Sequence, residues 1–130
     1  MINERMTIGE AINIVDSVKP NNRSKEEKIM WLSNLDAMVK EDIYDTHEGG
    51  ENYPFSGYTS DTPDDTELLI PAHYGREIYR HYLELQIDLI NKEIAKYNSA
   101  AAQFQAQYSA FDLYWHNHHC PLQPCSISGV

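Results

Sequence analysis

One seven-residue rhythm runs unbroken through the last third of the chain. Ten apolar or aromatic residues follow one another at steps of four and three: Leu83, Ile87, Ile90, Ile94, Tyr97, Ala101, Phe104, Tyr108, Phe111 and Trp115. This spacing is typical of one face of a long α-helix. A continuous helix from near Ala72 to near Trp115 would be roughly 60 Å long, longer than a compact domain of this size is wide. We therefore expect its far end to contact other subunits.

Two residues inside this stretch leave an alternative open. Asn98 and Ser99 favour the N-terminal cap of a helix, so a kink or a helix-loop-helix break could fall there. The rhythm continues through both residues, and we therefore predict one helix. After Lys96, Asp112 is the only formally charged side chain in the final thirty-four residues. A helix surface without Lys and Glu indicates a helix that neighbours cover.

Two shorter helices are predicted earlier in the chain. Thr7 and Glu10 have the spacing of a capping box, and Ser24 and Glu27 repeat it. Apolar residues then recur at helical spacing, which predicts helices from Thr7 to near Pro20 and from about Ser24 to Thr46. In the second helix, five polar residues are expected on faces away from the apolar stripe: Lys25, Lys28, Asn34, Asp36 and Lys40.

The negative charge is concentrated between the second and third helices. The net charge is −10, and nine acids but no Lys or Arg lie between residues 41 and 75: Glu41, Asp42, Asp45, Glu48, Glu51, Asp61, Asp64, Asp65 and Glu67. The remainder, with eleven acids and ten bases, is nearly neutral. No calcium-binding loop pattern is present. Many copies around a pore would form a negative ring that repels the phosphate backbone of DNA.

The predicted fold class is all-α: a small bundle of three main helices with a very long C-terminal helix. A long acidic loop, residues 47–70, separates the second and third helices, and Leu68-Leu69-Ile70 reads as a brief extended piece before Pro71. A loop of this length is functional, disordered or ordered by a partner. We expect one helical domain, 1–118, followed by an extended tail, 119–130.

No catalytic signature is found in the sequence. It has no nucleophile elbow, no glycine-rich phosphate loop and no His-Glu-x-x-His motif, so we predict a non-enzymatic protein without a cofactor. One cluster could be considered for a metal: His116, His118, His119, Cys120 and Cys125. Its spacing matches no strong zinc pattern, and we predict neither a metal site nor a disulfide framework.

No membrane segment is expected. No run approaches the roughly 20 apolar residues of a membrane span, and the first residues lack the apolar stretch of a secretory signal. We expect a protein made in the cytoplasm that does not bind membranes.

Several short motifs resemble, in order and spacing, the head-tail connector proteins of tailed bacteriophages, also called adaptor or head-completion proteins. The first is Thr7-Ile8-x-Glu10-Ala11-Ile12-x-x-Val15-Asp16, and the next are Lys28-x-x-Trp31-Leu32-Ser33-x-Leu35-Asp36 and residues 65–71, Asp-Thr-Glu-Leu-Leu-Ile-Pro. The likeness continues in Tyr79-x-x-Tyr82-Leu83-Glu84-x-Gln86-Ile87-Asp88-x-x-Asn91-x-Glu93-x-x-x-Tyr97-Asn98. It covers roughly residues 7–118.

The resemblance implies a structural virion protein at the head-tail interface, assembled in the cytoplasm of the host bacterium. Such proteins form a ring, commonly of twelve copies, under the capsid portal. They extend the DNA channel, through which DNA passes without specific binding, and they dock the neck or tail-completion protein. The implied partners are therefore the portal protein, the neck or tail-completion protein and the protein itself.

Three sets of residues are candidates for these contacts. Portal binding is assigned, by resemblance, to the C-terminal segment: Tyr114, Trp115, His116, Pro121, Leu122 and Ile127. The acidic loop would face the channel or a neighbouring subunit through Glu48, Glu51, Asp61, Asp64, Asp65 and Glu67. The helix stripe would contact the neighbouring subunit through Tyr97, Phe104, Tyr108 and Phe111.

An alternative function comes from a different class of protein. An acidic helical protein can bind a basic host protein, as a DNA-mimicking inhibitor or an antirepressor does. Mimics spread carboxylates over rigid helices, whereas the acids of this chain lie in a glycine-containing loop. A third hypothesis, a metal protein that uses the His/Cys tail, would be tested by its zinc content.

Overall fold

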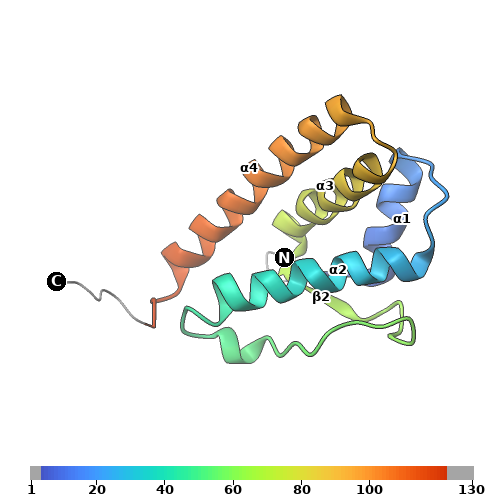
Figure 1. Cartoon of the computed structure of the whole chain (residues 1–130). Helices are drawn as coiled ribbons and strands as arrows, with labels where there is room; N and C mark the ends of the chain where they lie inside the picture. The colour runs from blue at the N-terminus through green and yellow to red at the C-terminus, as the bar shows by residue number, and fades with distance from the viewer. Residues whose placement is uncertain (1–3, 123–130) are drawn as a thin grey trace.

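The computed structural model describes residues 4–122 and is mostly helical, with one small sheet (Figure 1). The elements follow in the order β1 (Arg5–Thr7), α1 (Ile8–Val18), α2 (Lys25–Val39), η1 (Lys40–Tyr44), η2 (Gly50–Asn52), β2 (Glu67–Pro71), α3 (Ala72–Ile90) and α4 (Ile94–His118). The elements η1 and η2 are a π-helical and a 3-10 turn. None of the described helices is long and apolar enough to cross a membrane.

The two predicted capping boxes are confirmed. The Thr7 hydroxyl accepts a hydrogen bond from the Glu10 amide, and the Glu10 carboxylate accepts one from the Thr7 amide. Ser24 and Glu27 form the same reciprocal pair at the start of α2. Each box satisfies two amides that the first turn of a helix leaves without partners. Sequence and structure therefore agree on where both helices begin.

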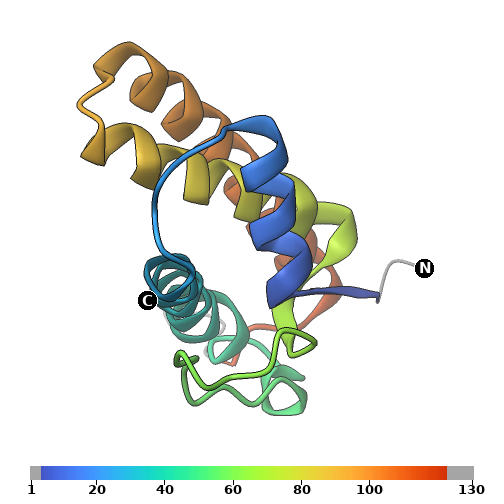
Figure 2. The same cartoon turned by 90° about the vertical axis from the view of Figure 1, so that its right-hand side faces the viewer.

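The prediction of one very long C-terminal helix is wrong. The helical chain stops after Ile90 and starts again at Ile94, so that α4 runs back along α3 as an antiparallel hairpin (Figures 1 and 2). The break does not fall at Asn98-Ser99, which lies inside α4. Residues 4–122 therefore form four α-helices and a two-stranded sheet in place of three main helices alone.

The physical reason for the break is a reversal of the chain around Lys92. The Glu93 amide donates to the Asp88 carbonyl (2.9 Å), and the Lys92 amide donates to the Leu89 carbonyl (3.1 Å). These are the two hydrogen bonds of a Schellman motif, which ends a helix on a left-handed residue. Lys92 adopts that conformation, with φ of 59°. Glycine is the usual residue at this position. Because a lysine stands there, the sequence carries no signal for the end of the helix.

The small sheet forms where an extended apolar piece was predicted. β2 pairs with β1 in an antiparallel arrangement, with Arg5 opposite Pro71 and Thr7 opposite Glu67. The sheet joins the N-terminal end of the chain to the segment just before α3. The fold class is therefore broadly helical, and the sheet is an addition to the predicted all-α bundle.

The core lies between α1, α2, β2 and the first part of α3. Its fully buried members include Ile8, Val15, Leu32, Leu35, Leu69, Ile78 and Leu83. α4 is the least covered helix, because only Ala100, Phe111 and Trp115 of its 25 residues are buried. Its aromatic stripe packs onto α3 of the same chain: the ring centroids of Phe104 and Tyr82 lie 5.3 Å apart, and those of Phe111 and Tyr74 lie 5.6 Å apart.

Candidate functional site

The nine acids of residues 41–67, which we call the acidic segment, are all exposed. The segment begins in η1, continues through η2 and an irregular stretch, and ends in β2. In Figure 1 it runs along the lower edge of the molecule, below α2. A separate edge of the fold therefore carries nearly all of the excess negative charge.

Intramolecular ion pairs neutralise only part of this charge. Lys25 pairs with Asp64 (2.7 Å), Lys40 with Asp45 (3.0 Å) and Arg5 with Glu67 (3.8 Å). Within residues 4–122, the other six acids of the segment form no ion pair: Glu41, Asp42, Glu48, Glu51, Asp61 and Asp65. These six carboxylates are the part of the segment that a cationic partner would meet.

The irregular part of the acidic segment is anchored by a buried carboxylate that the sequence analysis placed on a polar face. Asp36 of α2 is fully buried. Its carboxylate accepts hydrogen bonds from the hydroxyls of Tyr58 (2.5 Å) and Tyr79 (2.6 Å) and from the Leu69 amide (3.0 Å). One side chain thereby joins the acidic segment, β2 and α3 to α2.

Burial changes the acid-base properties of this network. Removal from water raises the pKa of Asp36 to about 6, although the hydrogen bonds from Tyr58, Tyr79 and Leu69 act in the opposite direction. The pKa values of Tyr58 and Tyr79 are raised, first by burial and then by the adjacent Asp36 carboxylate. Both phenols are therefore hydrogen-bond donors at neutral pH.

Aromatic packing and one glycine fix the first half of the segment. Tyr53 packs on Tyr44, with ring centroids 4.6 Å apart, and the rings of Phe55 and Tyr58 lie 5.1 Å apart. A Cβ atom at Gly50 would lie 2.0 Å from the Tyr44 carbonyl oxygen, so only glycine fits this approach. The predicted loop is thus a folded part of its own subunit.

Residues 119–122, which we call the C-terminal arm, lie against the start of the same segment. The Glu48 amide donates to the Cys120 carbonyl (2.8 Å), and the Leu122 amide donates to the Thr46 carbonyl (3.0 Å). Pro121 forms an isolated antiparallel bridge with His47. The Nε2 atom of His47 also lies 3.1 Å from the Nδ1 atom of His116. A cleft of about 510 Å³ opens beside these contacts, and its lining includes His47, His116 and Leu122.

The structure separates the residues that were assigned to portal binding. Trp115 is buried, with its ring 4.4 Å from that of Tyr44 and stacked on His119 at 3.7 Å. It cannot meet a partner unless the fold opens. Tyr114 and Pro121 are half-buried, and His116 and Leu122 are exposed. Ile127 lies outside the described residues. Of the described members, only His116 and Leu122 are exposed enough to meet a partner directly.

The aromatic stripe assigned to contacts between subunits also faces the interior of the chain. Phe111 is buried, and Phe104 and Tyr108 pack against the core. Tyr97 is half-buried. The outer face of α4 consists mainly of small or uncharged residues, among which Leu113 is 61% exposed. A contact through Phe111 would require α4 to leave α3, whereas Tyr97, Phe104 and Tyr108 are half-buried and keep part of their surface accessible.

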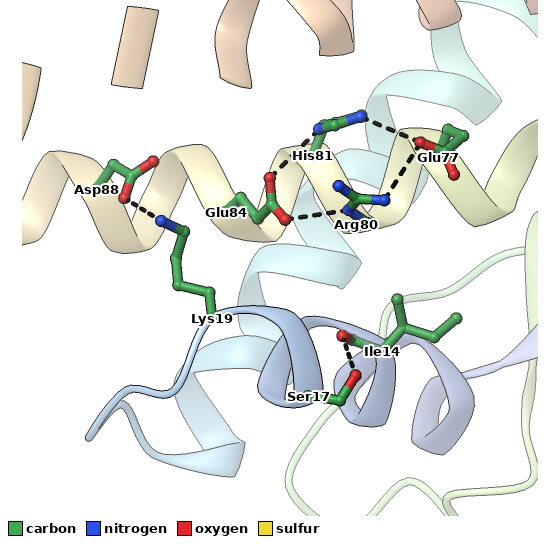
Figure 3. Close-up of polar contacts among 8 residues, drawn as sticks. All are labelled: Ile14, Ser17, Lys19, Glu77, Arg80, His81, Glu84 and Asp88. Carbon is green, nitrogen blue, oxygen red and sulfur yellow. Dashed lines mark hydrogen bonds and ion pairs between the residues drawn. The ribbon is translucent and has the colours of Figure 1, made fainter. Parts of the chain in front are cut away.

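Most of the bases are already paired with acids. Figure 3 shows this along α3, where Arg80 lies between Glu77 and Glu84, and Lys19 reaches the buried Asp88 (2.9 Å). His81 also lies between the two glutamates. A cleft of about 480 Å³ borders these side chains. Among the described residues, only Arg76 and Lys92 are bases outside every ion pair, so the chain presents no basic patch for nucleic acid.

The proposed third function, a His/Cys metal site, receives no geometric support in the described part of the chain. Residues 4–122 contain no group of three or more His, Cys, Asp or Glu side chains placed to hold a metal ion. Cys120 is exposed and free. Cys125 lies outside the described residues.

Comparison of the chain with protein-family models, with curated proteins and with solved structures gives no match.

Proposed function

We propose that this protein is a head-tail connector of a tailed bacteriophage, a non-enzymatic component of the virion. It would form a ring of copies under the capsid portal, extend the DNA channel and dock the neck or tail. The proposal begins with the ordered motifs between residues 7 and 98 that resemble this family. The predicted very long helix gives it no support, because that stretch of chain forms the α3–α4 hairpin.

The observation that carries the proposal is the separate acidic edge. Six carboxylates without ion pairs lie on one folded segment, while ion pairs occupy most of the bases elsewhere in the described chain. A ring that turned this edge toward its axis would line the channel with negative charge, which disfavours contact with DNA phosphates. DNA would then pass without being held.

The test is association with a purified portal ring from the same phage. Light scattering and sedimentation should show a complex at micromolar protein, with several copies bound to each ring. The isolated protein should not retard duplex DNA in a gel at low salt. Failure to bind the portal, or tight binding to DNA, would contradict the proposal.

A second candidate is an acidic protein that binds a basic host protein. The anchoring of the acidic segment by Asp36 favours it, because the exposed carboxylates are held on a fixed scaffold and a DNA mimic needs such a scaffold. Competition separates the two functions. A mimic would displace DNA from a basic target protein, whereas a connector would bind the portal and leave that protein–DNA complex intact.

A further inference from the structure

The tip of the α3–α4 hairpin exposes apolar side chains next to a lysine. Leu89, Ile90 and Ile94 are 49%, 40% and 59% exposed, and they make up three of the seven large apolar residues that the described chain exposes. Lys92 lies between them at the turn. Apolar side chains gathered at an exposed projection mark an interaction surface.

The backbone of Lys92 is an independent sign that its side chain has a role. The residue is the only non-glycine residue with positive φ in the described chain, at the Schellman position where glycine costs least. A side chain kept in an unfavourable backbone conformation points to a function for that side chain. Lys92 forms no ion pair within residues 4–122, whereas the neighbouring Lys96 pairs with Glu93 (3.0 Å).

A complementary hollow lies on the acidic segment. A depression of about 360 Å³ is lined in part by Pro54, Phe55 and Tyr58. Its lining also includes Arg5 and Glu67, which pair with each other at 3.8 Å. Thr62 and Thr66 line it as well, and they are next in sequence to Asp61 and Asp65, two of the exposed acids without ion pairs. The hollow therefore has aromatic walls and one internal ion pair, and two unpaired acids follow its lining in sequence.

We propose that the hairpin tip of one copy docks into the aromatic depression of the acidic segment of a second copy, with Lys92 facing Asp61 and Asp65. The apolar side chains of the tip suit the aromatic walls of the hollow, and the unpaired Lys92 suits the unpaired carboxylates beside it. Because tip and depression are different surfaces of one chain, the contact is head-to-tail and can propagate from copy to copy. This deepens the proposed function, since a head-to-tail contact that closes on itself gives a ring. Asp61 and Asp65 would then lie between copies, and the other four unpaired carboxylates would remain for the channel. The pairwise contact does not depend on a portal.

Sedimentation velocity of the isolated full chain, over a range of protein and salt concentrations, tests the contact. Wild type should associate with rising concentration, and more weakly at high salt because the charges are screened. Leu89→Gln should weaken association at least tenfold by removing apolar contact. Arg76→Gln is the matched control, because Arg76 is the other exposed base without an ion pair, and it should associate as wild type does.

Lys92→Gly separates a docking role from a structural one. It relieves the left-handed conformation, so the urea midpoint should rise, while association should fall roughly fivefold with the lost charge pair. A merely structural lysine would give unchanged association. Lys92→Glu should abolish association, and mixing it with Asp61→Lys/Asp65→Lys should restore it in the mixture alone.

The proposal is overturned if wild type sediments as a monomer at every concentration and salt. It is also overturned if Lys92→Gly or Leu89→Gln associates like wild type. Failure of the mixture of Lys92→Glu with Asp61→Lys/Asp65→Lys to associate would overturn it as well. None of these measurements contains a portal. A chain that associates with itself and ignores the portal would contradict only the proposed function.

Discussion

Tyr79 donates a hydrogen bond of 2.6 Å to Asp36, across 43 residues of sequence, and so joins α3 to α2 inside the core. The same phenol oxygen accepts from the Ile70 amide (2.9 Å). The buried carboxylate therefore acts through Tyr79 on the strand before α3 as well as directly through Leu69.

Replacing Asp36 with alanine should destabilise the fold. The change leaves the hydroxyls of Tyr58 and Tyr79 and the Leu69 amide without an acceptor, and we expect the free energy of unfolding to fall by about 2 kcal/mol, after allowing for the relieved burial of a charge. Urea unfolding followed by circular dichroism measures it. Asp112→Ala, an exposed acid on α4, is the control and should change stability by less than about 0.5 kcal/mol.

The stability of the protein should depend on pH through Asp36. Its pKa is about 6 in the folded chain, above the ordinary value of 3.8, so the folded state binds the proton more tightly. The stabilisation is complete below the ordinary pKa of 3.8 and is lost as the pH rises through about 6. The loss is about 3 kcal/mol if the unfolded chain has the ordinary value.

Asp36→Asn isolates this contribution, because asparagine does not titrate. General repulsion among the acids also weakens the wild type as pH rises, and the variant retains that effect. Urea unfolding at several values between pH 4 and pH 7 should therefore give a shallower slope for Asp36→Asn. Equal slopes for the two proteins would show that Asp36 has an ordinary pKa.

Two glycines of the acidic segment should respond to alanine for different reasons. At Gly50 the new Cβ atom would meet the Tyr44 carbonyl at 2.0 Å, so Gly50→Ala should cost about 2–3 kcal/mol by displacing the backbone. At Gly57 a new Cβ atom would lie an acceptable 3.7 Å from the Ser33 Oγ atom, but φ is +100°. Gly57→Ala should therefore cost about 1 kcal/mol from backbone conformation alone. Thermal and urea unfolding of both variants compares them, and a larger loss at Gly57 would contradict the packing described around Gly50.

The residues that the resemblance assigns to portal binding should divide into structural and accessible ones. Trp115→Ala should cost about 3–5 kcal/mol, because it empties a buried aromatic site. Leu122→Ser changes an exposed side chain and should leave the urea midpoint nearly unchanged. If the arm meets the portal, Leu122→Ser should weaken portal binding in a folded protein. Unchanged portal binding would show that the portal does not contact Leu122.

Local signals in the sequence were sufficient for the starts of the helices. The Thr7 and Ser24 capping boxes use residues three apart, and the three-residue apolar piece before Pro71 fits the extended strand β2. The hairpin was missed because Ile90 and Ile94 keep the four-residue step across the turn. The turn residue itself is a lysine, which gives no warning of a left-handed backbone.

Asp36 could not be placed from the sequence, since its partners Tyr58, Leu69 and Tyr79 are 22, 33 and 43 residues away. A single acid within a helix follows the pattern of a solvated face. Lys28, also expected on a polar face, is likewise buried and pairs with Asp16 at 2.7 Å. The positions of these charges are decided by tertiary packing, which local spacing does not encode.

The hydrogen bonds around β2 limit its ability to pair with a strand of another molecule. Besides the pairing with β1, side chains engage its main-chain groups. The Leu69 amide donates to Asp36, and the Ile70 amide donates to Tyr79. The Leu69 carbonyl accepts from Tyr44, and the Leu68 carbonyl accepts from Arg5. A strand whose amides and carbonyls are already engaged offers no template for another chain. Many molecules could therefore be held at high local density without amyloid-like stacking at this strand.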